Sequence, residues 1–433
     1  MTRHVKRIGA LAGCALLLVS CSSKPPKSLV TPLPTVSTPT QQSNEPMRGI
    51  WLATVSRLDW PPVASVNGRS ADQRIAMQKQ ALTSKLDNLK RLGINTVFFQ
   101  VKPDSTALWS SKILPWSDML TGNIGEYPGY DPLQFMLDEA HKRGMKVHAW
   151  FNPYRVSVNT KPSTIAELNN TLTQVPASVF VLHRNWIRTA SDRFVLDPGI
   201  PEARDWITSI VAEVVQNYPI DGVQFDDYFY TETASSPLND NETFRRYGQG
   251  YASKGDWRRH NTQQLIAQVS ATIKKLNPNV EFGVSPAGVW RNRSHDPAGS
   301  DTRGAAAYDE SYADTRSWVQ QGLLDYIAPQ IYWPFARDAA RYDVLANWWA
   351  EVVKPTHTRL YIGVALYKVG EPSKNEPDWT VDGGVPELKK QLDLNETLPQ
   401  IQGTILFREN NLNQPQTRQA VNYLRSRWGQ PQS

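Results

Sequence analysis

Two adjacent carboxyl groups, those of Asp226 and Asp227, are followed directly by three aromatic residues. The residues before them alternate apolar and polar side chains, which is typical of a β-strand with two different faces. Gln224, Asp226 and Tyr228 then share the polar face. Paired carboxyl groups can hydrolyse a glycosidic bond, one acting at the anomeric carbon and the other protonating the leaving oxygen. We therefore predict a catalytic site here, the alternative being that Asp226 only caps the following loop.

The second carboxyl group of such a reaction has several candidates. Asp227 lies beside Asp226, and adjacent carboxylates disfavour each other's ionisation, so one of the two should keep its proton to a higher pH. Glu310 is a further candidate acid, Asp309 is nearly as good, and Glu232 is another. Asp309 and Glu310 could instead begin a helix, where acidic residues interact favourably with the helix dipole.

Polar and aromatic residues also follow other segments that resemble strands. Amides, hydroxyls and a guanidinium can hydrogen-bond sugar hydroxyls, and aromatic rings can stack on the C–H faces of a sugar. Each of these residues could instead form a turn or a buried, satisfied polar group. The predicted substrate-binding residues are Gln100, Asn152, Tyr154, Arg155, Gln224, Tyr228, Gln330, Tyr332 and Trp333.

These residues require a scaffold that brings the ends of many strands together. Eight segments rich in β-branched and aromatic residues alternate with helix-like segments, which predicts an α/β fold, a (β/α)8 TIM barrel with enlarged loops. An open doubly wound sheet is the alternative, but no glycine-rich phosphate loop follows the first strand. The predicted strands are 49–55, 95–101, 146–152, 222–228, 281–286, 326–333, 360–367 and 404–408. The predicted helices are 71–92, 131–144, 201–217, 256–276, 309–321, 338–353, 386–392 and 416–428.

Other chemistries find little support in the sequence. It contains no H-E-x-x-H motif and no pair of histidines four residues apart, so we expect neither a metal site nor a cofactor. It contains no G-x-S-x-G motif of esterases. The D-x-x-D-x-D-x-E pattern of chitinase-like barrels is broken by Gln224 and Tyr228. No run of five like charges occurs, so a nucleic-acid partner is not expected.

The first twenty residues predict a secretory signal. Arg3, Lys6 and Arg7 precede an apolar run, and removing these three charges lowers the formal net charge from +6 to +3. Cys21 follows Leu-Val-Ser, which resembles the lipobox of bacterial lipoproteins, and Ser22 favours sorting to the outer membrane. An ordinary signal peptide with a nearby cysteine is the alternative. Lipidation at Cys21 predicts an outer-membrane lipoprotein that faces the periplasm.

The sequence predicts that the chain is divided into three regions. Residues 1–20 form the signal peptide, and 21–46 form a lipidated cysteine and a tether with six prolines and no aromatic residue. Such a composition cannot bury a core, so an extended and solvated segment is expected. The barrel domain is predicted over 47–428.

Five motifs in order make the chain resemble the glycosyl hydrolase-like 10 family over about 46–392. They begin at Met47, Asn95, Ala149, Asp221 and Asp325 and read MRGIWL, NTVFFQV, AWFNPYR, DGVQFDDY and DYIAPQIYW. This resemblance implies a glycosidase that cleaves peptidoglycan glycan strands lacking stem peptides during cell division, with the division machinery as a possible partner. The family is also similar to α-amylase-type barrels at the fourth motif, which implies a nucleophile at Asp226. A non-catalytic glycan-binding lipoprotein is the alternative function.

Overall fold

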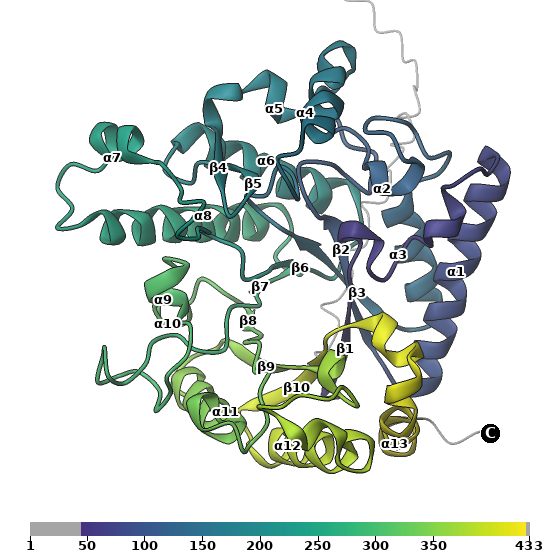
Figure 1. Ribbon diagram of the computed structural model, residues 1–433, viewed down its shortest axis with the longest axis vertical. Coiled ribbons are helices and arrows are strands. Elements are labelled where there is room, and N and C mark those ends of the chain that lie inside the picture. Colours follow the sequence, from purple (N-terminus) through teal and green to yellow (C-terminus); the bar gives the residue numbers. More distant parts are fainter. Residues whose placement is uncertain (1–44, 430–433) are drawn as a thin grey trace, which may run out of the picture. The chain divides into compact units, whose positions relative to one another are not determined.

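Residues 45–429 of the chain are described by a computed structural model. The predicted signal peptide, Cys21 and all but the last two residues of the predicted tether lie outside this range. Eight parallel strands close into a barrel in the order β1-β10-β9-β8-β7-β6-β3-β2, and helices surround it (Figure 1). The predicted TIM barrel is thus confirmed. Its strands are β1 (Met47–Leu52), β2 (Thr96–Lys102), β3 (Lys146–Phe151), β6 (Gly222–Phe225), β7 (Glu281–Val284), β8 (Tyr326–Ile327), β9 (Arg359–Val364) and β10 (Ile401–Leu406).

One principal helix follows each barrel strand, as the (β/α)8 pattern requires. These helices are α1 (Ala71–Leu92), α3 (Pro132–Lys142), α6 (Pro201–Asn217), α8 (Lys254–Leu276), α10 (Thr315–Gln320), α11 (Tyr342–Val353), α12 (Val385–Thr397) and α13 (Arg418–Trp428). Short helices in the loops are α2 (Asp118–Thr121), α4 (Pro162–Asn169), α5 (Val179–Leu182), α7 (Asn241–Tyr247) and α9 (Ala307–Glu310). Among the described residues, no helix is both long and apolar enough to cross a membrane.

Local signals explain where several helices begin and end. Ser70 and Gln73 form a reciprocal capping box at the start of α1, and Gly93 ends it with a left-handed φ of 90°. The predicted helix 309–321 is wrong in one respect, because two short helices, α9 and α10, occupy this region. Tyr312 lies between them with a φ of 49°, which a continuous α-helix does not tolerate.

Aromatic side chains fill the interior of the barrel. Trp51, Phe98, Tyr326 and Tyr361 belong to one buried cluster. His148 joins them, with 2.9 Å between its Nδ1 and the Tyr326 hydroxyl. Burial lowers the pKa of His148 to about 3, so the imidazole is neutral at physiological pH. The interior is therefore a packed core that supports the open end of the barrel.

Gly283 in β7 leaves room for the ring of Tyr326. A Cβ at Gly283 would lie 2.3 Å from this buried ring. We expect Gly283→Ala to lower the free energy of unfolding by about 1–3 kcal/mol, because a packed core cannot absorb the extra methyl group. Gly304→Ala is the matched control, since its nearest neighbour would be 3.4 Å away. Thermal unfolding of both variants tests this, and an unchanged midpoint for Gly283→Ala would show that the ring can move.

The segment between β3 and α6 carries an additional hairpin that was not predicted from the sequence. Strands β4 (Ile187–Ala190) and β5 (Arg193–Leu196) pair antiparallel around a two-residue turn. Their alternating apolar and polar residues were the available signal, but the turn residues, Ser191 and Asp192, are not the usual Asn-Gly pair. The hairpin lies with α4, α5 and α7 on one side of the barrel opening (Figure 1).

Candidate active site

Asp226 follows the last residue of β6 and is almost completely buried. The side chains of Val223 and Phe225 pack in the main apolar core, so the alternation of the strand turns Asp226 toward the barrel opening. Its Oδ2 accepts a hydrogen bond of 3.0 Å from the Trp150 indole, and its Oδ1 accepts one of 3.1 Å from the Tyr228 backbone amide. Two donors thus fix the orientation of this carboxyl group.

Burial raises the pKa of Asp226 to about 7, and the negative charge of Asp227 adds to this shift. The Arg155 guanidinium and the Trp150 hydrogen bond act in the opposite direction. Near neutral pH the group can therefore either hold or release a proton. A carboxyl group in this range is suited to acid–base or nucleophilic chemistry.

Asp227 is half-buried and faces a different part of the barrel. Its Oδ1 accepts a hydrogen bond of 3.1 Å from Gln330 Nε2, and this same nitrogen donates to the Ser285 carbonyl at 3.0 Å. Burial raises the pKa of Asp227 as well. The negative charge of Asp227 also contributes to the raised pKa of Tyr332, which places the two side chains near each other. The structure thus brings Asp226, Asp227, Gln330 and Tyr332 together.

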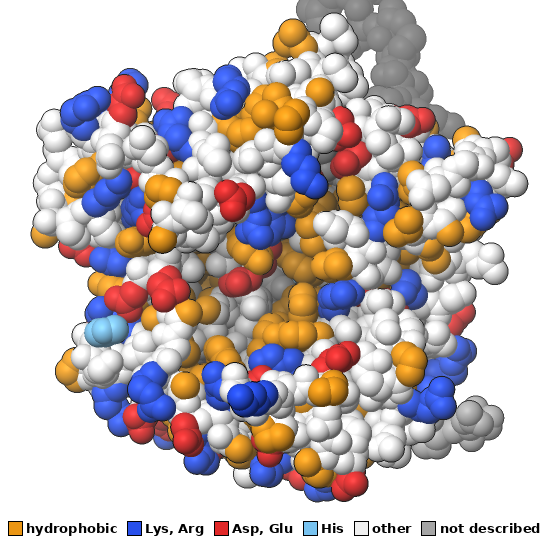
Figure 2. All heavy atoms as spheres, viewed as in Figure 1, with side chains coloured by type: hydrophobic (Ala, Val, Ile, Leu, Met, Phe, Trp, Pro, Cys, Tyr) orange, Lys and Arg blue, Asp and Glu red, His pale blue; other side chains and the backbone are white. Residues whose placement is uncertain are grey.

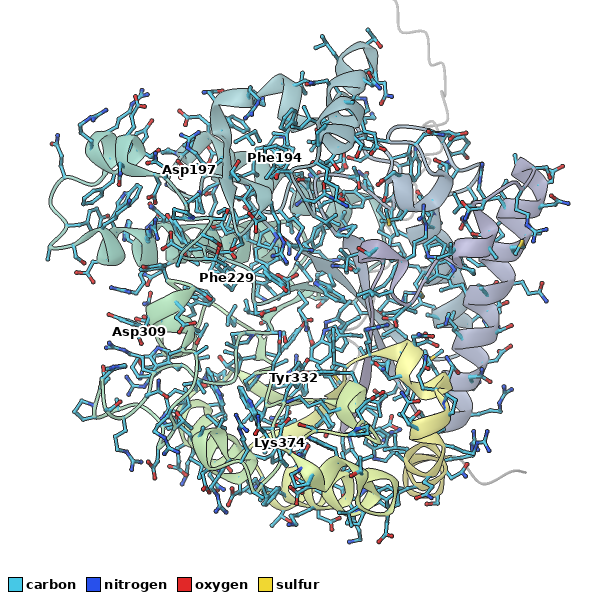
Figure 3. All side chains as sticks on the ribbon, in the orientation of Figure 1. Phe194, Asp197, Phe229, Asp309, Tyr332 and Lys374 are labelled. Atoms are coloured by element: carbon cyan, nitrogen blue, oxygen red, sulfur yellow. The ribbon has the colours of Figure 1, made fainter. Side chains whose placement is uncertain are left out.

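The other candidate acids lie apart from this pair. Glu310 is exposed at the end of α9 and is not among the charged groups that most strongly shift the pKa of Asp226 or Asp227. Asp309 pairs with Arg291 at 2.9 Å and lies on the rim, away from Tyr332 (Figure 3). Glu232 pairs with Arg258 at 2.8 Å. Asp227 is therefore the one candidate acid that shares the end of β6 with Asp226.

Arg155 and Tyr228 form one wall of the opening. The Arg155 guanidinium lies 4.7 Å from the centre of the Tyr228 ring and donates to the Pro103 carbonyl at 3.2 Å. The backbone amide of Arg155 donates to Asn152 Oδ1 at 3.0 Å. Tyr228 is 37% exposed, so its ring is available to a ligand.

Besides Arg155, four of the predicted sugar contacts are buried. Gln100 Oε1 accepts from the amides of Thr54 and Val55, at 3.0 and 2.9 Å. Gln224 accepts from the Trp51 indole at 2.6 Å and donates to the Tyr326 hydroxyl at 3.2 Å. The structure therefore assigns both amides to the support of the opening, in place of the sugar contact expected from the sequence.

Asn152 and Tyr154 are the other two predicted sugar contacts that are buried. Asn152 is fully buried beneath the opening, and Tyr154 packs in the main apolar core. Within residues 45–429, neither Asn152 Nδ2 nor the Tyr154 hydroxyl has a hydrogen-bond partner. Their burial places them beneath the opening, and a contact of either side chain with a sugar stays a prediction.

Lys102 is a buried cation that supports this region. Its ammonium donates to the carbonyl oxygens of Asn152 and Pro153 at 2.7 and 3.4 Å, which holds the loop after β3. Burial lowers the pKa of Lys102 to about 7, while the charges of Asp104 and Asp226 raise it. Its position at the end of β2, in the sequence Gln-Val-Lys, was the signal that could have identified it.

An aromatic cluster forms the wall of the opening opposite Arg155 and Tyr228. The rings of Tyr332 and Phe407 are stacked with centres 5.8 Å apart, and Tyr367 contacts both edge-on at 5.6 and 6.0 Å. Figure 2 shows hydrophobic surface in the hollow at the centre of this face. Tyr367 and Phe407 were not predicted as site residues, although both lie near the ends of segments predicted as strands. Trp333 is half-buried and packs against the main core.

A side pocket of about 210 Å³ adjoins the loops after β1, β2 and β3. Asp104, Asp118 and Glu167 are among its lining residues. Burial raises the pKa of Asp118 to about 7, and the negative charges of Asp104 and Glu167 add to this shift. In the part of the chain that the structure describes, no group of three or more His, Cys, Asp or Glu residues is arranged to hold a metal ion.

Comparisons with known proteins agree with this geometry. The family model of glycosyl hydrolase-like 10 matches residues 46–381. The chain is 77% identical to glycosyl hydrolase DigH of Escherichia coli O6:H1 and 76% identical to DigH of strain K12, over 98% of this chain and 97% of each relative. It is 43% identical to glycosyl hydrolase YngK of Bacillus subtilis, over 86% of this chain and 70% of that relative. The prediction of a glycosidase is confirmed, and the chain belongs to the glycosyl hydrolase-like 10 family.

Proposed function

We propose that this glycosidase cleaves the glycan strands of peptidoglycan, specifically strands that have lost their stem peptides. The observation that carries the proposal is the pair Asp226 and Asp227 at the open end of the barrel, facing an aromatic wall that suits a sugar ring. Membership of the glycosyl hydrolase-like 10 family supports glycoside cleavage, and peptidoglycan as the substrate follows from the resemblance given by the five sequence motifs. Cell division is the proposed setting, with the division machinery as a partner.

In the proposed reaction, Asp226 acts at the anomeric carbon, and Asp227 protonates the leaving oxygen. The fixed orientation of Asp226 suits the first role, because its two hydrogen-bond donors hold the carboxylate in one position. Burial raises the pKa of Asp227 above its ordinary value, which extends the pH range over which it can hold the proton that an acid must supply. Gln330 and Tyr332 lie beside Asp227 and would contact the sugar hydroxyls.

Mass spectrometry of the products tests this proposal. Purified protein is incubated with glycan strands stripped of stem peptides, and the Asp226→Asn variant controls for contaminating enzymes. We expect shorter oligosaccharides with a new reducing end. Products with anhydro-sugar ends would instead mean a lytic transglycosylase, and uncut strands that sediment with the protein would mean a glycan-binding lipoprotein.

We also propose that the protein is anchored in the outer membrane through lipid on Cys21 and faces the periplasm. The Leu-Val-Ser-Cys sequence and the proline-rich segment after it support this. At about 3.1 Å per residue, a fully extended segment of this length could reach on the order of 75 Å. We expect Cys21→Ser to move the protein from the membrane to the soluble fraction, while Cys14→Ser leaves it in the membrane. A Cys21→Ser protein that still sediments with membranes would contradict lipid anchoring.

A further inference from the structure

Arg193 is the first residue of β5 and stands at the tip of the hairpin beside the barrel opening. The turn residues before it, Ser191 and Asp192, have left-handed φ angles of 51° and 55°. Residues from another loop hold this turn, since the Asp192 amide donates to Ser236 Oγ at 2.9 Å and the hydroxyls of Ser191 and Thr231 lie 2.8 Å apart. The backbone that carries Arg193 is therefore fixed relative to the end of β6.

The remainder of the hairpin is joined to the loop after β3. Val156 donates its amide to the Phe194 carbonyl at 2.8 Å, and Leu196 donates to the Tyr154 carbonyl at 2.9 Å. Phe194 lies on one side of the opening, and Tyr332 lies on the other (Figure 3). The hairpin thus forms the side of the cleft that faces the aromatic wall.

The guanidinium of Arg193 lies near the ring of Tyr228, which directly follows the carboxyl pair in the sequence. It lies 5.5 Å from the centre of the Tyr228 ring, and its charge lowers the pKa of Asp227. Within residues 45–429 its side chain forms no ion pair and no hydrogen bond. Neighbouring arginines differ, because Arg155 donates to a carbonyl oxygen and Arg188 pairs with Asp197 at 3.3 Å. A guanidinium that forms no direct ion pair at the side of a cleft can bind a carboxylate of a ligand.

We propose that Arg193 binds the lactyl carboxylate that a muramyl residue exposes once its stem peptide has been removed. This inference rests on the proposed function and adds the group that selects the substrate. A stem peptide converts that carboxylate into an uncharged amide and adds bulk at the same place. Arg193 would therefore favour stripped strands through charge, with the exposed Tyr228 ring lying beneath the bound group.

The test compares two forms of one substrate, namely stripped strands with free lactyl carboxylates and the same strands converted to methylamides. We expect the wild-type protein to cleave the free acid with a kcat/KM about 10- to 100-fold higher, the range of a charge-assisted hydrogen bond. Arg193→Gln should reduce this ratio to about threefold or less, and Arg193→Lys should restore part of it. Arg184→Gln, which removes an exposed guanidinium 4.5 Å from the buried Phe180 ring, should leave the ratio unchanged.

Two outcomes would overturn the inference. In the first, the wild-type protein cleaves both strands equally well; in the second, Arg193→Gln lowers kcat/KM by the same factor on both. Failure of the proposed function would be distinct, because the wild-type protein would then cleave neither strand. In that case, calorimetry with N-acetylmuramic acid and its methylamide decides the role of Arg193: equal binding of the two compounds, or no binding of either, overturns the inference.

Discussion

Asp226→Asn is expected to lower kcat by about 10²–10⁴-fold, the range over which a positioned catalytic carboxyl group contributes to a rate. Asparagine keeps the size of the side chain and an oxygen that can accept from the Trp150 indole, but it cannot carry the negative charge. The loss should therefore appear in turnover and not in folding. Steady-state release of reducing ends from stripped strands measures the effect, and turnover near the wild-type level would contradict the assignment.

The Asp226→Asn substitution is also expected to change the pH dependence of the stability of the folded protein. The pKa of Asp226 in the folded protein is about 7, against an ordinary value of 3.8, so ionisation disfavours the folded state. Below about pH 4 the group is protonated in both states and this cost is absent; the cost grows as the pH rises and is complete above about pH 7. One pKa unit corresponds to about 1.4 kcal/mol. We expect Asp226→Asn to have a Tm equal to or above that of the wild type at pH 8, with no gain at pH 4.

Glu310→Gln is the matched control for these measurements. Glu310 is exposed on α9, apart from the residues that hold Asp226. Its replacement should leave both turnover and Tm close to those of the wild-type protein. An inactive Glu310→Gln with an unchanged Tm would instead identify Glu310 as the acid and exclude Asp227 from that role.

Asp227→Asn is expected to lower kcat by about 10²–10³-fold and also to shift the pH dependence of the remaining activity. The charge of Asp227 raises the pKa of Asp226, so its removal lowers that pKa. In the wild-type protein, activity that requires ionised Asp226 should fall as the pH drops through about 7. In Asp227→Asn this acid limb should move to lower pH.

A complete pH profile of kcat/KM for both proteins tests this shift. The other charged groups near Asp226 are Arg155 and Lys102, and neither is changed by the substitution. An acid limb that stays in place would mean that Asp227 does not act on Asp226 through its charge. Full activity in Asp227→Asn would remove it from the proposed reaction.

Much of the scaffold could be predicted because its signals are local. The ends of α1 follow from Ser70, Gln73 and Gly93, each of which acts on its own helix terminus. The break between α9 and α10 could not be predicted in this way. Tyr312, which adopts the left-handed conformation there, packs against Tyr230 and Arg258 from other parts of the chain.

The roles of the polar residues of the site likewise depend on contacts with distant parts of the chain. Gln100, Gln224 and Gln330 all lie in or after segments predicted as strands, and nothing in their local sequence separates their roles. Gln224 pairs with Trp51, which is 173 residues away, whereas Gln330 donates to Asp227, which is 103 residues away. Only the fold determines which amide supports the barrel and which one reaches the carboxyl pair.

The sequence by itself determined the eight strands, their helices and the carboxyl pair at the end of β6, because side-chain periodicity and helix caps act over a few residues. The tertiary structure alone decided that Glu310 is exposed, that Gln100 and Gln224 are buried, and that Arg193 on an unpredicted hairpin lies near the Tyr228 ring. Burial, hydrogen-bond partners and pKa shifts depend on groups far apart in the chain, and these become neighbours only when the barrel closes.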